Sequence, residues 1–219
     1  MALSRSKSTG HDLVVQLQIG GATVPKTHRV LSADIWLALN RVGRAMLRIR
    51  DDSTDAGCFA ISSSPLYVPG AELALLLGYG TMDSCIFKGI IISHGLAVSA
   101  DEGPSLQLEA ADPAVAMTTG RRSALYSNLT DSQLIENLLS NYKLKGSVTS
   151  TSEQHHVIIQ HSASDWDLML MRAEMNAMVV ACEQGVITIS PPNTNMNPEL
   201  ELTYGESILS AKLSLRDRV

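Results

Sequence analysis

Apolar and polar residues alternate along several short stretches of the first half of the chain, which is the period of half-buried β-strands. The alternation is regular over residues 13–19 and ends at Gly20-Gly21. Two near-continuous apolar runs, 73–79 and 86–92, are separated by a turn signal at 80–83 and predict a hairpin. Three further alternating stretches cover residues 35–39, 46–49 and 106–110. Strands at such short spacing predict a closed or strongly bent antiparallel sheet.

The helical period appears in the second half of the chain, after a predicted loop that carries Arg121-Arg122. Apolar residues from Leu134 to Tyr142 predict a first helix, and Thr130 with Gln133 forms a capping box at its start. A second helix is predicted over residues 166–175. Ser164 followed by Asp167 is an acidic version of the same start signal.

Short strands surround these two helices. One strand is predicted at residues 157–159, and two more, 178–181 and 186–189, flank a tight turn at 183–185. A loop over residues 191–198 precedes two last alternating stretches, 199–204 and 208–215. The pattern as a whole predicts an α+β chain that is mostly β.

Composition excludes several classes of function. The 219 residues carry a net charge of −5 and no basic block, so nucleic acid is not expected as the primary ligand. The three cysteines are widely spaced and match neither a disulfide scaffold nor a zinc pattern. We find no signal peptide and no apolar run of the roughly 20 residues that a membrane helix needs. Export would therefore use a route other than the general secretory one.

Several side chains invite a chemical interpretation. His155, His156 and His161 could ligate a metal, but adjacent strand residues face opposite sides, which favours polar strand residues at an interface. Asp165 and Asp167 could be a hydrolytic carboxylate pair, although first-turn acids already interact with the helix dipole.

The neighbouring residues of the second helix have simpler interpretations. Trp166 lies on an apolar helix face and is expected to anchor a core. Arg172 and Glu174 are expected at the surface or in subunit contacts. Arg121-Arg122 is too small a basic patch for nucleic-acid binding and is expected in an exposed loop.

The run QHSASDWDLMLMRAEMNAMVV resembles the SDWDFL..RAE..G signature of valine–glycine repeat (VgrG) spike proteins and of phage baseplate hub proteins (late control protein D). Phe87-Lys88-Gly89-Ile90-Ile91 resembles the F.G.V strand of that family, and Thr130-Asp131-Ser132 resembles the helix before its histidine-bearing strand, which here carries His155. The resemblance covers roughly residues 12–215, with Asn176-Ala177 where an aromatic or glycine pair is common. The matching residues of the signature are Ser164, Asp165, Trp166, Asp167, Leu168, Arg172, Ala173, Glu174 and Asn176.

This resemblance implies the N-terminal hub region of the spike or baseplate of a contractile injection system. Members are homotrimeric hubs that adapt a hexameric inner tube to a trimeric spike, with no catalytic, cofactor-binding or metal-binding residue. The implied partners are a second and third copy, an inner-tube (Hcp-like) protein, and spike-tip and baseplate proteins, without nucleic acid or membrane insertion. The alternative is a baseplate-associated cell-wall hydrolase or its scaffold.

The resemblance also implies a domain organisation. Residues 1–11 would be a flexible N-terminus, 12–112 a first β-barrel domain of the tail-tube type, and 113–192 an α/β connector domain. Residues 193–219 would begin a second, incomplete tube-like β-barrel domain. The protein would be synthesised and assembled in the bacterial cytoplasm without a signal peptide and exported as part of an injection particle.

Overall fold

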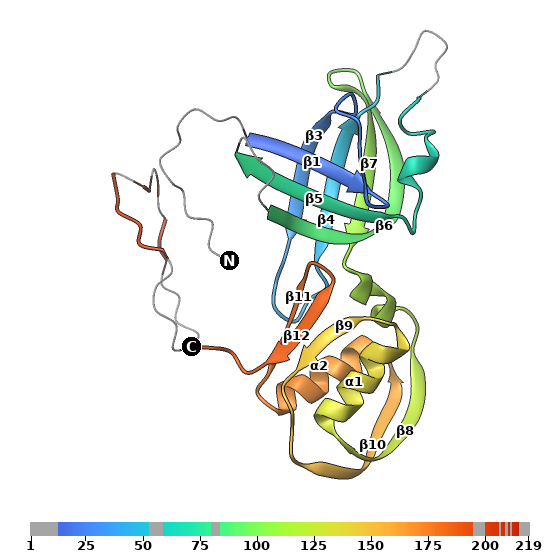
Figure 1. Ribbon diagram of the computed structural model, residues 1–219, viewed down its shortest axis with the longest axis vertical. Coiled ribbons are helices and arrows are strands. Elements are labelled where there is room, and N and C mark those ends of the chain that lie inside the picture. Colours follow the sequence, from blue (N-terminus) through green and yellow to red (C-terminus); the bar gives the residue numbers. More distant parts are fainter. Residues whose placement is uncertain are drawn as a thin grey trace. The chain divides into compact units, whose positions relative to one another are not determined.

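The computed structural model describes residues 13–52, 59–79, 84–194, 200–205, 207, 208, 210 and 212–214. Residues 12–192 belong to one compact unit. This unit is α+β and mostly β, as the sequence predicts (Figure 1). The predicted flexible N-terminus 1–11, the turn 80–83, Cys58 and residues 216–219 lie outside the described residues.

The first half of the unit is a seven-stranded antiparallel sheet, which we call the barrel. Its strands follow the order β2-β1-β5-β6-β7-β4-β3, so β3 is a terminal strand and the two-residue β2 covers part of the other edge. The strands are β1 (Leu13–Ile19), β2 (Ala22–Thr23), β3 (Val30–Trp36), β4 (Arg44–Arg50), β5 (Glu72–Tyr79), β6 (Ser84–Ser99) and β7 (Gly103–Ala111).

The long strand β6 bends this sheet. Its first part pairs with β5 and the rest with β7, and register shifts occur at Leu75/Leu76 and at Ile91/Ser93. Such irregularities increase local twist and let a sheet curl. Figure 1 shows β1 and β5 crossing β3, β4 and β7 at a steep angle. The apolar faces therefore meet in one core.

That core is aliphatic and receives one aromatic side chain from outside the sheet. Tyr67, in the short 3₁₀ helix η1 (Pro65–Tyr67), is fully buried. Its hydroxyl lies 2.6 Å from His28 Nδ1, and its carbonyl oxygen lies 2.7 Å from His94 Nδ1. Burial raises the pKa of Tyr67 to about 12. His28, in a loop, thus contacts the Tyr67 hydroxyl, and His94, on β6, contacts the Tyr67 backbone.

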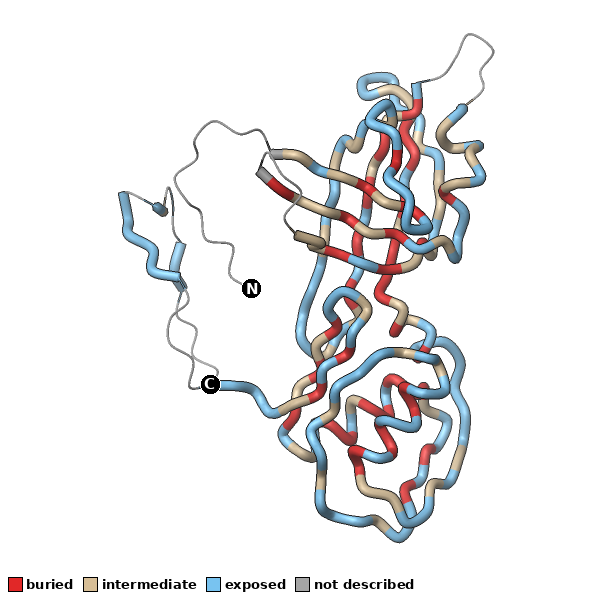
Figure 2. Tube along the Cα trace, viewed as in Figure 1, coloured by how far each residue is buried: buried red, intermediate tan, exposed pale blue. Residues whose placement is uncertain are grey.

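The second half, which we call the connector, packs two helices against short strands. Its core lies between the helices and the inner strand faces (Figure 2), and it includes Leu134, Leu138, Trp166 and Met169. β8 and β10 form one antiparallel pair, while β11, β12 and β9 form a small mixed sheet. The elements are η2 (Pro113–Thr118), β8 (Arg122–Thr130), α1 (Asp131–Asn141), β9 (Lys145–Val148), β10 (Gln154–Ala163), α2 (Asp165–Met175), β11 (Val179–Glu183) and β12 (Val186–Ser190).

Local signals in the sequence locate the connector's helices and hairpin correctly. Thr130 caps α1 with the predicted capping box. The turn between β11 and β12 has two residues with positive φ, Gln184 at 54° and Gly185 at 79°, as a type I′ hairpin requires. The predicted strand 157–159 is the centre of the longer β10.

Two expectations from the sequence were wrong and one strand was missed; in addition, the predicted strand 35–39 ends at Trp36, where β3 ends. The predicted loop through Arg122 is the start of strand β8. The strand was missed because Leu125, an outward-facing residue 70% exposed, is apolar and interrupts the alternation of apolar and polar residues. β9 was not predicted, because Val148 is the one large apolar residue among its four and Gly146 is a poor strand former. Within the described part of 200–214, the predicted strands reduce to one isolated bridge between Tyr204 and Ile208.

Gly89 is required by the close approach of β6 to the end of β7. A Cβ atom there would lie 2.4 Å from the Ala111 carbonyl oxygen. We expect Gly89→Ala to lower the free energy of unfolding by about 2 kcal/mol or more, as overpacking does in a rigid backbone. Gly95→Ala, in the same strand with nothing within 4 Å, is the matched control. Denaturant unfolding measures both, and equal losses would contradict the steric explanation.

Candidate functional site

The two helices of the connector each begin with a buried carboxylate. Asp131 opens α1 and Asp165 opens α2, and both residues are 4% exposed. The preceding residues Thr130 and Ser164 are the N-caps, and the Ser164 hydroxyl accepts the Asp167 N–H at 3.0 Å. Because each cap sets the first residue of its helix, it also sets the position of the carboxylate that follows it.

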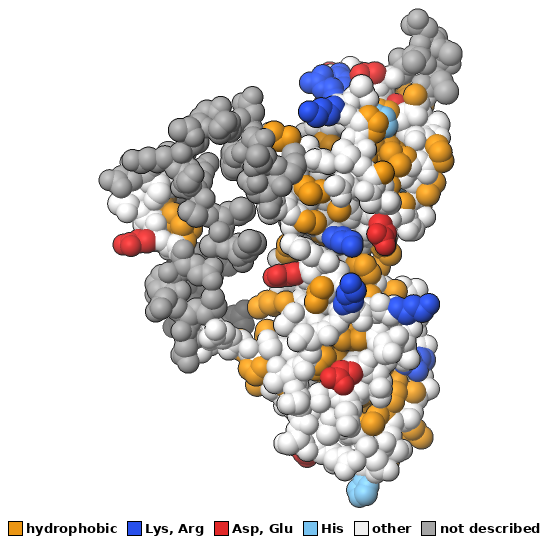
Figure 3. Space-filling model, viewed as in Figure 1, with side chains coloured by type: hydrophobic (Ala, Val, Ile, Leu, Met, Phe, Trp, Pro, Cys, Tyr) orange, Lys and Arg blue, Asp and Glu red, His pale blue; other side chains and the backbone are white. Residues whose placement is uncertain are grey.

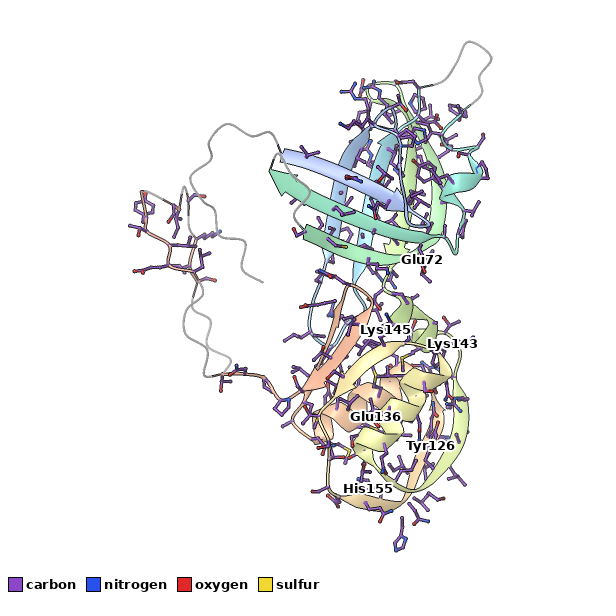
Figure 4. The ribbon with its side chains drawn as sticks, viewed as in Figure 1. Glu72, Tyr126, Glu136, Lys143, Lys145 and His155 are labelled. Carbon is purple, nitrogen blue, oxygen red and sulfur yellow. The ribbon has the colours of Figure 1, made fainter. Side chains whose placement is uncertain are left out.

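Asp131 lies in a cluster with three residues from α2 and β10. Its carboxylate accepts hydrogen bonds from Arg172 Nε and, at 2.8 Å, from Asn176 Nδ2. His155 Nε2 lies 3.2 Å from Asp131 Oδ2 and 2.8 Å from an Arg172 terminal nitrogen. A guanidinium has no acceptor, so the shorter contact uses the lone pair of His155 Nε2. Figure 4 labels His155 at this end of the connector.

The pKa of Asp131 reflects two opposing effects. Burial alone would raise it, but the hydrogen bonds from Arg172 and Asn176 and the nearby guanidinium charge lower it below its usual value. The carboxylate is therefore ionised and has a donor on each oxygen. The cluster joins the start of α1 to the end of α2 and to β10.

Asp165 is the centre of a second cluster. Arg122 Nε and NH2 donate to its two oxygens at 2.8 and 3.0 Å, a bidentate pair. Tyr142 Oη donates at 2.9 Å and Gln160 Nε2 at 2.8 Å. The Tyr126 hydroxyl, also labelled in Figure 4, donates to Gln160 Oε1 at 3.0 Å. One carboxylate thus ties β8, β10 and the end of α1 to the start of α2.

This arrangement favours a structural role for both carboxylates. Burial would raise the pKa of Asp165, but the hydrogen bonds from Arg122, Gln160 and Tyr142 together lower it. A glycosidase-type general acid needs a raised pKa, and a nucleophile needs a free oxygen lone pair facing the substrate. Asp131 and Asp165 have lowered pKa values and donors on both oxygens.

The other predicted residues are spread over both halves of the unit. Trp166 is 6% exposed and packs in the connector core, as an anchor should. Asp167 and Glu174 are exposed on α2. Phe87 is buried in the barrel core, and Gly89 lies two residues further along β6. The structure therefore brings together Asp131, His155 and Arg172, whereas Phe87 and Gly89 belong to the barrel.

Three expectations about individual side chains need correction. Arg172 is 8% exposed and pairs with Asp131, so it is not a surface or subunit contact in this unit. Arg122 lies on β8 and pairs with Asp165. His155 contacts the Asp131 pair, while His156 and His161 are exposed.

Sequence reasoning also missed several members of the two clusters. Asn176 could have been found, because it lies four residues after Arg172 and therefore on the same helix face. Arg122, Gln160 and Tyr142 had no such signal. The roles of Arg122 and Gln160 depend on the pairing of β8 with β10, and that of Tyr142, the C-cap of α1, depends on the packing of α1 against α2; both are long-range contacts.

The described residues show neither a metal-binding group of side chains nor a membrane-spanning helix. Among them, no three histidine, cysteine, aspartate or glutamate side chains are grouped so that they could hold a metal ion. The helices in the described part of the chain are also too short or too polar to cross a membrane.

We expect Asp165→Asn to lower the free energy of unfolding by about 2 kcal/mol, because Arg122 loses its ionic partner and the new amide places a donor against other donors. Asp167→Asn is the matched control, since Asp167 is exposed in the same helical turn. Its effect should stay within about 0.5 kcal/mol. Chemical denaturation of both variants measures the difference, and equal effects would exclude the buried cluster as its cause.

Acid should destabilise the connector through the same groups. Asp131 and Asp165 have folded-state pKa values below the unfolded value of about 3.9. Their stabilisation is therefore present above that pH and is lost as the pH falls through the folded-state values. Melting temperatures recorded between pH 7 and pH 3 should fall less steeply for Asp165→Asn than for the parent protein. Parallel curves would show that Asp165 does not contribute to the acid sensitivity.

Comparison with solved structures relates this fold to tail proteins. The 43 kDa tail protein of prophage MuSo2 from Shewanella oneidensis has 13% identity and a TM-score of 0.64, over 82% of this chain and 53% of that one. A tail protein from Neisseria meningitidis MC58 has 14% identity and a TM-score of 0.63, over 85% and 53%. An E. coli component of the type VI secretion system, described as structurally similar to the T4 tail proteins gp27 and gp5, has 14% identity and a TM-score of 0.62, over 83% and 50%.

At these identities the likeness shows a shared fold, and the chain spans about half the length of these three proteins. A search of curated proteins found no match. Comparison with protein families matched nearly the whole chain, residues 10–218, to the family described as the Alg8 N-terminal domain. On that match, the chain belongs to the Alg8 N-terminal domain family.

Proposed function

We propose that this chain is the N-terminal hub region of the spike or baseplate of a contractile injection system, of the VgrG and late-control type. In this role it forms a homotrimer that adapts a hexameric inner tube to a trimeric spike. The observation that carries the proposal is the fold, a bent seven-stranded barrel followed by a two-helix connector, which a type VI secretion component and two tail proteins share.

The two polar clusters support a structural role for this chain and do not support a catalytic one. The Asp165 carboxylate accepts four hydrogen bonds and Asp131 has a donor on each oxygen, so both carboxylates hold elements together. The proposed role is therefore non-enzymatic. The two cluster carboxylates lack the raised pKa of a general acid, and Asp112, whose pKa burial does raise, accepts the Ala114 N–H as the N-cap of η2.

The edge of the barrel supports association with other subunits. β3 is a terminal strand of seven residues, and its outer side has no paired strand within the described part of the chain. Leu31 and Trp36 on it are 43% and 56% exposed. Long, apolar edges normally pair with another chain or are protected. Figure 3 shows further hydrophobic side chains over this unit, mixed with charges of both signs.

Further parts of the proposal concern domains, partners and location. We assign residues 12–112 to a first tube-like barrel, 113–192 to the connector and 193–219 to the start of a second barrel. An inner-tube (Hcp-like) protein, spike-tip proteins and baseplate proteins are the proposed partners. Assembly takes place in the bacterial cytoplasm, and export occurs as part of the injection particle.

Mass in solution tests the proposal most directly. Light scattering should give three times the protomer mass for the protein expressed from its native gene. Trp36→Glu should shift that mass towards the monomer, because a charge at an edge strand opposes pairing, while the exposed side chain leaves protomer stability nearly unchanged. Leu125→Glu, at a side chain 70% exposed in the connector, is the control. A monomeric parent protein would refute the hub proposal.

A further inference from the structure

The barrel and the connector have separate hydrophobic cores. All strands of the barrel precede residue 112 and all elements of the connector follow it, so the chain passes between them once, at residues 111–113. A single covalent crossing leaves the relative orientation of two bodies free unless other contacts fix it.

The β11–β12 hairpin supplies such contacts along one strand. Asn40, in the loop between β3 and β4, donates its N–H to the Val180 carbonyl at 2.7 Å. In return, the Val180 N–H donates to Asn40 Oδ1 at 2.8 Å. Asn40 has a φ of 60°, in the left-handed region that asparagine tolerates better than most residues. The pair covers the open edge of β11 with a residue of the barrel.

The turn of the hairpin makes two more contacts. Gln184 Nε2 donates to the Cys85 carbonyl at the start of β6, at 2.8 Å. The Asp112 carboxylate, beside this turn, accepts the Ala114 N–H at 2.9 Å. Burial raises the pKa of Asp112, and the backbone N–H groups of Ala114 and Gly185 oppose that rise. The Asp112 N–H in turn donates to the Gly43 carbonyl at 2.9 Å. Both ends of the hairpin therefore bond to residues at the end of the barrel.

Apolar packing between the two halves is limited. Val42 is the barrel residue that packs on the connector core. A shallow open cleft of about 160 Å³ separates the loop at Leu37 and Leu39 from β11 at Cys182. Leu37 and Leu39 are 52% and 58% exposed. The hydrogen bonds of the hairpin thus carry much of the contact.

We propose that the β11–β12 hairpin is a clamp that fixes the connector on the barrel. With the clamp closed, the two halves form one cooperative body. With its side-chain bonds removed, they become two bodies that unfold and reorient separately about residues 111–113. The clamp concerns the protomer alone, so it does not depend on the proposed trimer.

The test is the double variant Asn40→Gly and Gln184→Ala in the full chain. Glycine keeps the positive φ at position 40, so only the side-chain bonds are lost. Gln154→Ala is the control, because Gln154 Nε2 also donates to a backbone carbonyl, that of Asn128, at 2.9 Å within the connector. Calorimetry and amide hydrogen exchange are recorded on all proteins.

The parent protein and Gln154→Ala should unfold in one transition. The double variant should unfold in two, with exchange at the Val180 amide about tenfold faster, the factor for one lost hydrogen bond. If the double variant does not fold, Gln184→Ala alone replaces it, and its expected results are separate melting of the two halves and faster exchange at the Val180 amide, whose bond to Asn40 opens with the clamp. One transition with unchanged exchange, or two transitions in the parent protein, would overturn the clamp.

Discussion

The buried carboxylate of Asp165 is the constraint on which the connector depends. An ionised group removed from water is tolerated only when partners replace its hydration, and here a guanidinium, a phenol and an amide do so. These donors come from β8, α1 and β10, while the carboxylate begins α2. Removing one element would leave a charge without its partners, so the cluster selects one arrangement of all four.

Asp131 repeats this design at the other end of the helix pair. Its partners Arg172 and Asn176 lie one turn apart on α2, so a single helix face supplies two donors to one carboxylate. The mostly aliphatic core between the clusters, with Trp166 in it, is adaptable because its contacts are not directional. The directional hydrogen bonds at both ends of the helix pair therefore define the relative position of α1 and α2, which apolar packing alone would define less sharply.

Features set by residues close together in the sequence could be predicted, whereas features set by contacts between distant residues could not. Caps, the positive-φ turn at Gln184 and Gly185, and helical periods are local, and they locate α1, α2 and the hairpin correctly. β8 was missed because its outward Leu125 is apolar and its inward partners are known only once β10 pairs with it. For the same reason Asp165 could be recognised as a first-turn acid, but its bond to Arg122 could not.

Rigidity in this unit is built from a few buried or shielded hydrogen bonds at element ends, with two modest cores between them. Within the connector the carboxylate clusters join helices to strands. Between connector and barrel, the β11–β12 hairpin bonds to Asn40 through Val180 and to the Cys85 carbonyl through Gln184. In the hub role proposed for this chain, such fixed directions would matter more than a large core. A hydrogen bond weakens steeply when its angle departs from linearity, whereas apolar contact depends little on angle. A few hydrogen bonds can therefore keep the geometry defined even where the free energy of unfolding is modest.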